Sequence, residues 1–353
     1  MGATYKAVQW NGNKRVYVFY VVAALASFLG VFMGVALMTR ASGHQADPVV
    51  LLIRALGSAS FLMLTIVLMI GPLARLSPRF LPMLYNRRHL GVLTFLVAAA
   101  HFALSLFWYH GGGPLNPFVS LFVSNPLYAS VAGFPFEAFG LGAFVILFLL
   151  AATSHDFWLN NLSAPVWKAL HMLVYVAYGL LVLHVAYGAL MTEKSAVYPA
   201  LMIAGLALVS GLHVVAGARE WTRDSGMKDV KAPDGWIDVC APDDIADGRA
   251  VIAPLPKGER VAVFRNGARL YGIANACRHQ NGPLGEGCVK DGLVTCPWHG
   301  WQYRLEDGVS PPPYSERVAT HDVRLSGQGR VFVRTRKNRL GQAGAFIDLG
   351  AAP

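Results

Sequence analysis

Residues 277–300 read CRHQNGPLGEGCVKDGLVTCPWHG and hold two short groups of metal-ligand side chains. Cys277 and His279 are separated by one residue, Cys296 and His299 by two, and sixteen residues lie between the two pairs. Two cysteines and two histidines in two loops can bind zinc. They can also bind a [2Fe–2S] cluster in which two histidines replace two cysteines on one iron.

The composition of this stretch favours the cluster over zinc. Each pair supplies one cysteine and one histidine, and the glycines between the pairs allow backbone amides to approach inorganic sulfides. The surrounding sequence combines β-branched and aromatic residues with turn residues, which predicts short β-strands. These strands are expected at residues 261–264, 269–273, 293–295, 301–305 and 331–335.

The motif CRH…CPWHGWQY, preceded by VAVFRNGARLYGIANAC and followed by LEDG…PPPYSERVAT, resembles the Rieske iron–sulfur family. It is similar to the Rieske ferredoxins that serve ring-hydroxylating oxygenases, and the resemblance covers residues 235–336. The resemblance implies a soluble all-β domain. It also implies a [2Fe–2S] cluster held by Cys277, His279, Cys296 and His299.

The sequence departs from the Rieske proteins of quinol-oxidising cytochrome bc complexes. Gly282 and Trp298 stand where that branch has a disulfide, and Trp301 stands where it has a serine that donates to a cluster sulfide. Because hydrogen bonds to sulfur stabilise the reduced cluster, the sequence predicts a reduction potential low in the Rieske range. Tyr303 is either a remaining donor to sulfur or an ordinary strand tyrosine.

The N-terminal two-thirds of the chain has a different composition. The 353-residue chain is 54% hydrophobic and only 14% charged, whereas soluble domains are about 25% charged. Six apolar segments approach the roughly 20 residues that cross a bilayer, which predicts a membrane all-α six-helix bundle. They cover 16–38, 50–73, 89–110, 135–153, 166–190 and 196–218. We expect the first to be a retained helix, because its apolar run is too long for a signal peptide.

The change in composition divides the chain into four parts. Residues 1–218 form the predicted transmembrane domain, and the polar stretch that follows makes residues 219–234 a predicted linker. Residues 235–336 form the predicted soluble all-β domain, and residues 337–353 a C-terminal tail.

Basic residues gather in the loops on one side of the predicted membrane. By the positive-inside rule, this asymmetry places both termini in the cytoplasm of a bacterial-type inner (plasma) membrane. The net charge of +10 is therefore largely topological, and we expect a lipid bilayer and no nucleic acid as partner. The residues concerned are Lys6, Lys14, Arg15, Arg75, Arg79, Arg87, Arg88, Arg219, Arg223, Lys228 and Lys231, against Arg40 and Lys194 on the opposite side.

All four cysteines belong to the predicted cytoplasmic domain. A reducing compartment disfavours structural disulfides, so metal binding is the better interpretation for a cysteine cluster there. Cys240 and Cys288 fit no metal-ligand pattern, and we expect them to be packed thiols.

Histidines inside the predicted spans suggest a second cofactor. His89 and His101 lie on the third span, and His171 and His184 on the fifth. Two histidines on each of two helices are typical of a bundle that holds haem between them. Their spacings of twelve and thirteen residues turn an ideal helix by about 120° and 220°, which favours one haem over two without excluding two. His213 on the sixth span is expected to serve in packing.

Three stretches of the membrane half resemble the ferric-reductase-type transmembrane domain. They are RRHLGVLTFLVAAAHF at 87–102, GFPFEAFGLGAFVILFLLAATS at 133–154 and VWKALHMLVYVAYGLLVLHVAYG at 166–188. The resemblance covers residues 50–217 and is nearest to the haem-binding membrane subunits of bacterial periplasmic methionine-sulfoxide reductase systems. It implies haem b on His101, His171 and His184, while His89 occupies a variable position.

These features predict an electron-transfer protein of the oxidoreductase type without catalytic residues of its own. No G-x-G-x-x-G nucleotide motif is found, and only His321 follows His299, so a mononuclear iron site of an oxygenase is not expected. Electrons would pass from a cytoplasmic reductase or ferredoxin-type donor through the cluster and one or two haems to a periplasmic redox partner or small acceptor. The edge formed by His279 and His299 would dock either the donor or the haem.

Three alternative functions remain open from the sequence. The chain could act as a terminal reductase of ferric iron or of a quinone at the outer face. It could be only a relay subunit whose partner holds the catalytic centre, or a redox sensor without electron throughput.

Overall fold

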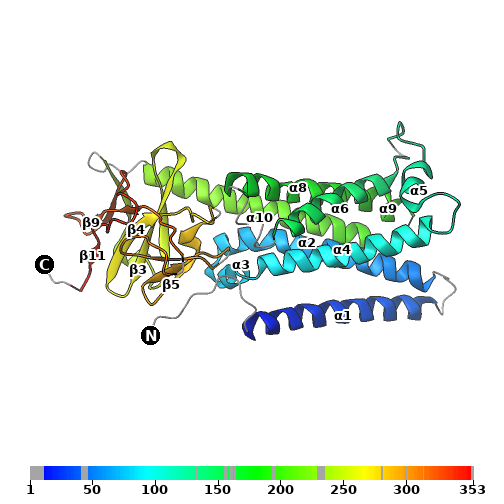
Figure 1. Ribbon diagram of the computed structural model, residues 1–353, viewed down its shortest axis with the longest axis horizontal. Coiled ribbons are helices and arrows are strands. Elements are labelled where there is room, and N and C mark those ends of the chain that lie inside the picture. Colours follow the sequence, from blue (N-terminus) through cyan, green and yellow to red (C-terminus); the bar gives the residue numbers. More distant parts are fainter. Residues whose placement is uncertain are drawn as a thin grey trace.

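The computed structural model describes most of the chain as a helical bundle with a β-domain at one end of it (Figure 1). The described residues are 12–40, 47–131, 133–154, 158, 162, 164–192, 196–228, 235–279, 281–298, 300–312 and 314–350. The predicted division into an all-α part with apolar helices able to cross a membrane and a C-terminal all-β part is confirmed.

Six long helices correspond to the six predicted spans. They are α1 (Gly12–Arg40), α2 (Pro48–Leu76), α4 (Arg87–His110), α6 (Phe136–Ala152), α8 (Ala164–Tyr187) and α10 (Val197–Lys228). Five of them are long and apolar enough to cross a membrane, and α6 is shorter at 17 residues, or about 25 Å. Short helices connect them: η1 (Pro78–Phe80), α3 (Leu81–Leu84), α5 (Pro117–Val123) and α9 (Ala189–Thr192).

Helix α2 is the central helix of the bundle, with contacts to α1, α4 and α10. Its start is fixed by Asp47, whose side chain accepts from the amide of Val49 at 2.8 Å and so caps the helix. Its middle joins α8, because the Thr65 hydroxyl lies 3.0 Å from the Tyr178 hydroxyl and the Phe61 ring stacks on the ring of Tyr178. These contacts place residues of α8, including Ala177 and Tyr178, in one hydrophobic core with residues of α2.

Helix α10 continues beyond the predicted membrane boundary. Residues 219–228, expected to belong to a linker, are the last turns of this helix, and residues 229–234 lie outside the described residues. Arg260 of the β-domain binds Glu220 at 3.0 Å and Asp224 at 2.5 Å. Glu220 and Asp224 are four residues apart and therefore share one face of the helix. The predicted domain boundary at 218 does not coincide with the end of α10, because polarity changes there while helix-forming residues continue.

The β-domain (residues 235–350) consists of small antiparallel sheets. One has the order β11–β4–β3–β2 with β8 beside β4, a second has β1–β10–β9, and a third has β5–β6–β7. The strands are β1 (Trp236–Cys240), β2 (Ala250–Pro254), β3 (Arg260–Asn266), β4 (Arg269–Ala274), β5 (Cys288–Lys290), β6 (Leu293–Thr295), β7 (Gln302–Arg304), β8 (Thr320–His321), β9 (Val323–Leu325), β10 (Val331–Arg334) and β11 (Ile347–Asp348). The five predicted strands correspond to β3, β4, β6, β7 and β10.

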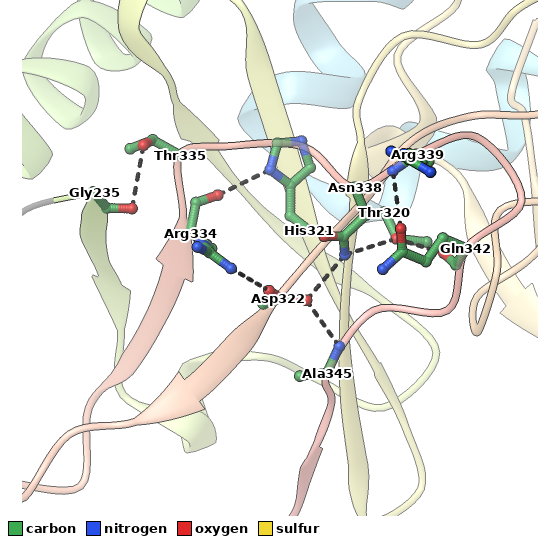
Figure 2. Close-up of polar contacts among 10 residues, drawn as sticks. All are labelled: Gly235, Thr320, His321, Asp322, Arg334, Thr335, Asn338, Arg339, Gln342 and Ala345. Atoms are coloured by element: carbon green, nitrogen blue, oxygen red, sulfur yellow. Dashed lines mark hydrogen bonds and ion pairs between the residues drawn. The ribbon is translucent and has the colours of Figure 1, made fainter.

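The segment predicted as a tail is part of the β-domain. Ile347 of β11 pairs with Leu270 of β4, and both side chains belong to the buried core. Asp322 holds the preceding segment: it accepts from the Asn338 side chain at 2.9 Å and from the Ala345 amide at 3.1 Å (Figure 2). The domain therefore includes residues 337–350, which the sequence did not predict because a two-residue strand has no periodicity.

The charge of Asp322 contributes to this arrangement. Burial alone would raise its pKa, but hydrogen bonds from Asn338, Ala345 and Arg334 outweigh burial and lower the pKa below the usual aspartate range. A carboxyl group with a lower pKa in the folded state stabilises the fold above its unfolded pKa. That stabilisation is lost as the pH falls through the folded pKa.

Replacing Ile347 by alanine should lower the free energy of unfolding of the β-domain by about 2–5 kcal/mol, because the side chain is only 6% exposed. Urea unfolding followed by near-UV circular dichroism measures the change. Leu340→Ala is the matched control, since Leu340 lies in the same segment but is 48% exposed and should change stability by less than about 0.5 kcal/mol. Equal effects of the two substitutions would contradict the docked position of β11.

Candidate functional site

The two loops that carry the predicted cluster ligands share one backbone pattern. In the first ligand loop (residues 275–287), the Cys277 amide donates to the Gly282 carbonyl at 2.9 Å, and the Asn281 amide donates to the Cys277 carbonyl at 2.7 Å. In the second ligand loop (residues 296–301), the Cys296 amide donates to the Trp301 carbonyl at 2.7 Å. The Gly300 amide donates to the Cys296 carbonyl at 2.9 Å. Each cysteine thus begins a turn of the same hydrogen-bonded form.

The fourth residue after each cysteine has a positive φ angle. Asn281 has φ 56° and Gly300 has φ 72°. Asparagine and glycine adopt this left-handed conformation most readily, which explains their presence in these turns. The sequence motif CRHQN…CPWHG therefore encodes two equivalent turns as well as the predicted ligands.

The two ligand loops lie against each other. A Cβ atom placed on Gly282 would lie 2.7 Å from the Sγ of Cys296 and 3.2 Å from the ring of Trp298. Glycine at 282 therefore allows the second loop to approach the first. Cys277 and Cys296 are both 1% exposed and belong to one buried hydrophobic cluster.

Of the two histidines predicted as ligands, the structure describes one. His279 is half-buried, and its ring stacks on Trp301 with centroids 4.3 Å apart and an angle of 8°. His299 lies outside the described residues. Among the described side chains, which exclude this fourth expected ligand, no three His, Cys, Asp or Glu residues form a metal-binding group.

Tyr303 provides a donor to one ligand sulfur. Its hydroxyl oxygen accepts from the Arg278 amide at 3.0 Å and lies 3.4 Å from the Sγ of Cys277. Burial and the neighbouring Cys277 raise the pKa of Tyr303, so the phenol stays protonated and can donate to the sulfur. The geometry favours the donor interpretation of this tyrosine over an ordinary strand residue. Among the described residues, two buried thiols, the imidazole of His279 in the first loop and a donor to sulfur fit a [2Fe–2S] cluster with mixed ligands.

No disulfide joins any of the four cysteines, all of which are described. Cys240 is buried in the β-domain core, as expected of a packed thiol. Cys288 lies where the β-domain meets the helices, with its Sγ 3.4 Å from the hydroxyl of Tyr85. Tyr85 follows α3 in the loop that leads to α4.

In the bundle, His101 of α4 and His184 of α8 face each other. Their ring centroids are 6.3 Å apart, and the ring planes are nearly perpendicular at 83°. His101 Nδ1 lies 2.8 Å from the carbonyl of Ile53, and His184 Nδ1 lies 2.9 Å from the carbonyl of Phe136. A carbonyl can only accept, so each Nδ1 carries the hydrogen and each Nε2 keeps its lone pair for a metal.

Glycines make room for both imidazoles. A Cβ atom on Gly57 of α2 would lie 2.9 Å from His101, and one on Gly140 of α6 would lie 2.7 Å from His184. Glycine costs about 1 kcal/mol in a helix relative to alanine, so close approach explains it here. Two imidazole nitrogens that each lie about 2 Å from one metal ion place their ring centres roughly 6 Å apart. This donor set fits an iron held between His101 and His184.

His171 lies near the β-domain end of α8. Its Nδ1 is 3.0 Å from the carbonyl of Trp167, and its ring stacks on the Trp167 ring at 3.7 Å. Its Nε2 lies 3.4 Å from the hydroxyl of Ser154, which donates to the Leu150 carbonyl at 2.7 Å. The serine hydrogen is thereby engaged elsewhere, so the Nε2 of His171 keeps its lone pair.

Two further histidines of the spans, His89 and His213, differ in setting. His89 is half-buried in the first turn of α4, the end nearer the β-domain. His213 of α10 has its Nε2 2.9 Å from the hydroxyl of Tyr175 on α8. Its Nδ1 lies 2.7 Å from the Val209 carbonyl. A hydrogen bond between two helices fits the packing role expected for His213.

Comparisons with known proteins agree with this division. Residues 235–339 match the model of the Rieske [2Fe-2S] domain, and residues 56–182 match that of the ferric reductase like transmembrane component. The ferredoxin component of the alkene monooxygenase system of Xanthobacter autotrophicus is 32% identical over 101 residues, which are 28% of this chain and 81% of the relative.

The membrane part has its own relatives. The protein-methionine-sulfoxide reductase heme-binding subunit of Herminiimonas arsenicoxydans is 33% identical over 153 residues, which are 43% of this chain; the chain spans 65% of the length of that subunit. A solved complex of reduced oxygenase and oxidized ferredoxin in carbazole 1,9a-dioxygenase contains a chain that is 25% identical. It is matched over 96% of its length and 30% of this chain, with a TM-score of 0.28.

The fold and these matches define a multi-pass membrane protein with an iron–sulfur domain. The chain belongs to the Rieske [2Fe-2S] family through its β-domain, which is fused to a ferric-reductase-like transmembrane domain.

Three residues at the site were not predicted from the sequence as parts of it: Tyr85, Trp167 and Glu286. Each contacts a residue of the other domain that is far away in the chain: Tyr85 contacts Cys288, Trp167 contacts Trp298, and Glu286 contacts Arg75. The only local signal was the tryptophan at the start of the W-x-x-LH motif.

Replacing Gly282 by alanine should lower the cluster content of the purified protein several-fold, because the added methyl group would displace Cys296. Iron and sulfide analysis with EPR of the reduced protein measures the content. Gly327→Ala is the control, since a Cβ there meets nothing within 4 Å. Full cluster content in Gly282→Ala would show that the loops do not approach as closely as described.

Proposed function

We propose that this protein carries electrons across a bacterial-type inner membrane. A cytoplasmic reductase or ferredoxin-type protein would reduce the Rieske cluster, and haem b in the bundle would pass the electrons to an acceptor at the outer face. The observation that carries this proposal is the pair of facing imidazoles, His101 and His184, in a bundle whose end is covered by the cluster domain.

The cluster is proposed to be held by Cys277, His279, Cys296 and His299. The buried thiols and the Tyr303 hydroxyl beside Cys277 support this assignment. Trp301 stands where another Rieske branch has a serine that donates to a cluster sulfide. In this chain Tyr303 is proposed to donate a hydrogen bond to the sulfur of Cys277. The cluster and a haem each exchange one electron at a time.

The haem is proposed to be held by His101 and His184. Their Nδ1–H groups donate to backbone carbonyls, which fixes the ring orientation and leaves each Nε2 to the iron. The heme-binding relatives of the membrane half support haem as the cofactor. His171 and His89 lie near the β-domain and are the proposed ligands of a second haem, if the protein binds two.

The proposed orientation places the β-domain and both termini in the cytoplasm. The basic residues expected on the inner side include Arg75 and Arg219, which lie at the bundle end next to the β-domain. Helix α5 lies at the opposite end (Figure 1). A periplasmic redox partner or a small acceptor would approach there.

A second candidate function is direct reduction of a quinone at the outer face. The region around α5 exposes the apolar side chains of Phe118, Val119, Phe122 and Val123. Phe118 also contacts Phe102 of α4, one residue after His101, with ring centroids 6.4 Å apart. An apolar surface close to the outer histidine pair suits a lipid-soluble acceptor. Quinone reduction by the purified protein, measured without any added partner, would favour this function.

Replacing His184 by alanine should remove one haem per chain, as measured by the pyridine haemochrome. A fall from one to zero or from two to one also gives the number of haems. Gly140→Ala should lower the haem content as well, because its methyl group would meet His184. Gly179→Ala on α8 is the control, since a Cβ there meets nothing within 4 Å. Unchanged haem content in His184→Ala would contradict the assigned pair.

Replacing Cys296 by serine tests the electron route itself. The variant should keep its haem content, lose the Rieske EPR signal, and show haem reduction at least ten-fold slower than the wild type. The donor is a soluble [2Fe–2S] ferredoxin kept reduced by NADPH and ferredoxin reductase. Cys240→Ala, in the β-domain core, is the control and should keep its rate. Haem reduction at the wild-type rate in Cys296→Ser would exclude the cluster as the entry point.

A further inference from the structure

The β-domain contacts the helical domain through both of its ligand loops. Glu286, in the first ligand loop, forms an ion pair with Arg75 in the last turn of α2 at 3.2 Å. Trp298, in the second ligand loop, packs against Trp167 in the first turn of α8, with ring centroids 5.9 Å apart. The surface that carries the cluster ligands is therefore the surface that faces the membrane domain.

Further contacts flank these two. The Tyr85 hydroxyl lies 3.4 Å from the Sγ of Cys288 and 3.5 Å from the carbonyl of Thr295, so it bridges two strands that adjoin the ligand loops. Arg260 binds the end of α10 through Glu220 and Asp224. The contacts surround the ligand loops on more than one side, which fixes the orientation of the β-domain as well as its position.

The aromatic contact continues into the membrane domain. The Trp167 ring stacks on the ring of His171 at 3.7 Å and an angle of 24°. On the other side, the Trp298 ring and the Sγ of Cys296 both lie close to Gly282, and Trp298 directly precedes His299 in the chain. Trp298 and Trp167 thus form a continuous line of aromatic rings from the cluster ligands to His171.

We propose that the Trp298–Trp167 contact is the electron-transfer junction between the Rieske cluster and the haem domain. Trp298 and Trp167 are positioning residues: they hold the two ligand regions together and fill the space between them with aromatic rings. This inference rests on the proposed function.

The junction transfers one electron and nothing else. One electron would pass from a reduced cluster held by Cys277, His279, Cys296 and His299 to the haem iron of the membrane domain, which would oxidise the cluster and reduce the haem iron by one electron each. No bond forms or breaks at either tryptophan, and no proton is required there. The reductant that restores the cluster is the cytoplasmic ferredoxin-type or reductase donor already named.

The junction also indicates which partner the surface formed by the ligand loops contacts. From the sequence, the His279–His299 edge could dock either the soluble donor or the haem domain. Because Trp298 and Glu286 of the two loops contact the bundle, this surface serves the haem domain. The cytoplasmic donor therefore binds another face of the β-domain, or it binds when the β-domain has left the bundle.

Charge reversal tests the docked arrangement without altering a residue next to a ligand. Exposed ion pairs contribute only about 0–1 kcal/mol, so Arg75→Glu is preferred over neutral substitution because it adds repulsion against Glu286. The double variant Arg75→Glu/Glu286→Arg restores attraction. Arg79→Glu is the control, since Arg79 is an exposed arginine of the adjacent turn.

Two measurements on the full-length purified protein are made for each variant. The first is the rate of haem reduction after photochemical reduction of the cluster. The second is the rate of alkylation of native Cys288 by iodoacetamide, followed by mass spectrometry. Cys288 is half-buried against Tyr85, so its alkylation reports on docking independently of electron transfer.

We expect Arg75→Glu to raise the alkylation rate and to lower the haem reduction rate, each several-fold, and the double variant to restore both. Trp298→Leu and Trp167→Leu should lower the haem reduction rate at least ten-fold, while the phenylalanine variants retain most of it. The cluster EPR signal and haem spectrum show whether each variant is intact. Trp221→Leu, an exposed tryptophan of α10, is the control.

Two results would overturn the inference, and they are distinguishable. If cluster-dependent haem reduction occurs in the wild type but stays unchanged in intact tryptophan variants and in Arg75→Glu, the junction is wrong and the proposed function stands. If the wild type shows no transfer from cluster to haem, the proposed function fails and the junction fails with it. Should the tryptophan variants lose the cluster, the charge-reversal series alone decides.

Discussion

The hydrogen bonds from His101 and His184 to backbone carbonyls of neighbouring helices govern the arrangement of the bundle. His101 on α4 reaches Ile53 on α2, and His184 on α8 reaches Phe136 at the start of α6. Each imidazole also lies against a glycine of the helix it binds, at Gly57 or Gly140. The helices therefore form two closely packed pairs, α2 with α4 and α6 with α8, and the two imidazole rings lie 6.3 Å apart between the pairs. The same hydrogen bonds that join the helices also fix the orientation of the two imidazole rings and leave each Nε2 without a hydrogen.

In the β-domain, the positions of the two cysteine thiols are fixed by a turn that occurs twice. Its two ligand loops use the same turn, with the same hydrogen bonds around each cysteine and a residue of positive φ four positions later. Buried thiols need their neighbouring backbone groups satisfied, since an unpaired buried amide costs about 1–3 kcal/mol. The repeated turn satisfies these groups and points both loops toward one site. Tyr303 then supplies the hydrogen bond to the Cys277 sulfur.

Features that depend on local spacing were accessible from the sequence, and features that depend on contacts between distant segments were not. The C-x-H and C-x-x-H pairs, the histidines of α4 and α8, and the strands β3, β4, β6, β7 and β10 follow from residue type and period. The predicted linker was misplaced because a helix that leaves the membrane changes its composition but keeps its conformation. The strand at Ile347 was missed because pairing with Leu270, rather than its own sequence, creates it. The contact of Trp298 with Trp167 joins residues 131 positions apart, and no single-sequence pattern reports such a pair.

Helix α10 runs without interruption from the bundle to the β-domain. The number of residues in this helix therefore determines which way its last turns face. Glu220 and Asp224 bind Arg260 only while they face the β-domain, and their direction is set by the number of helical residues that separate them from the membrane. One inserted residue would rotate these carboxylates by about 100° and advance them by about 1.5 Å. Seven inserted residues would nearly restore their direction but would displace the β-domain by about 10 Å. The length of α10 thus sets both the distance and the direction of the β-domain relative to the bundle. A change in this length requires a matching change in the contacting surfaces of the two domains.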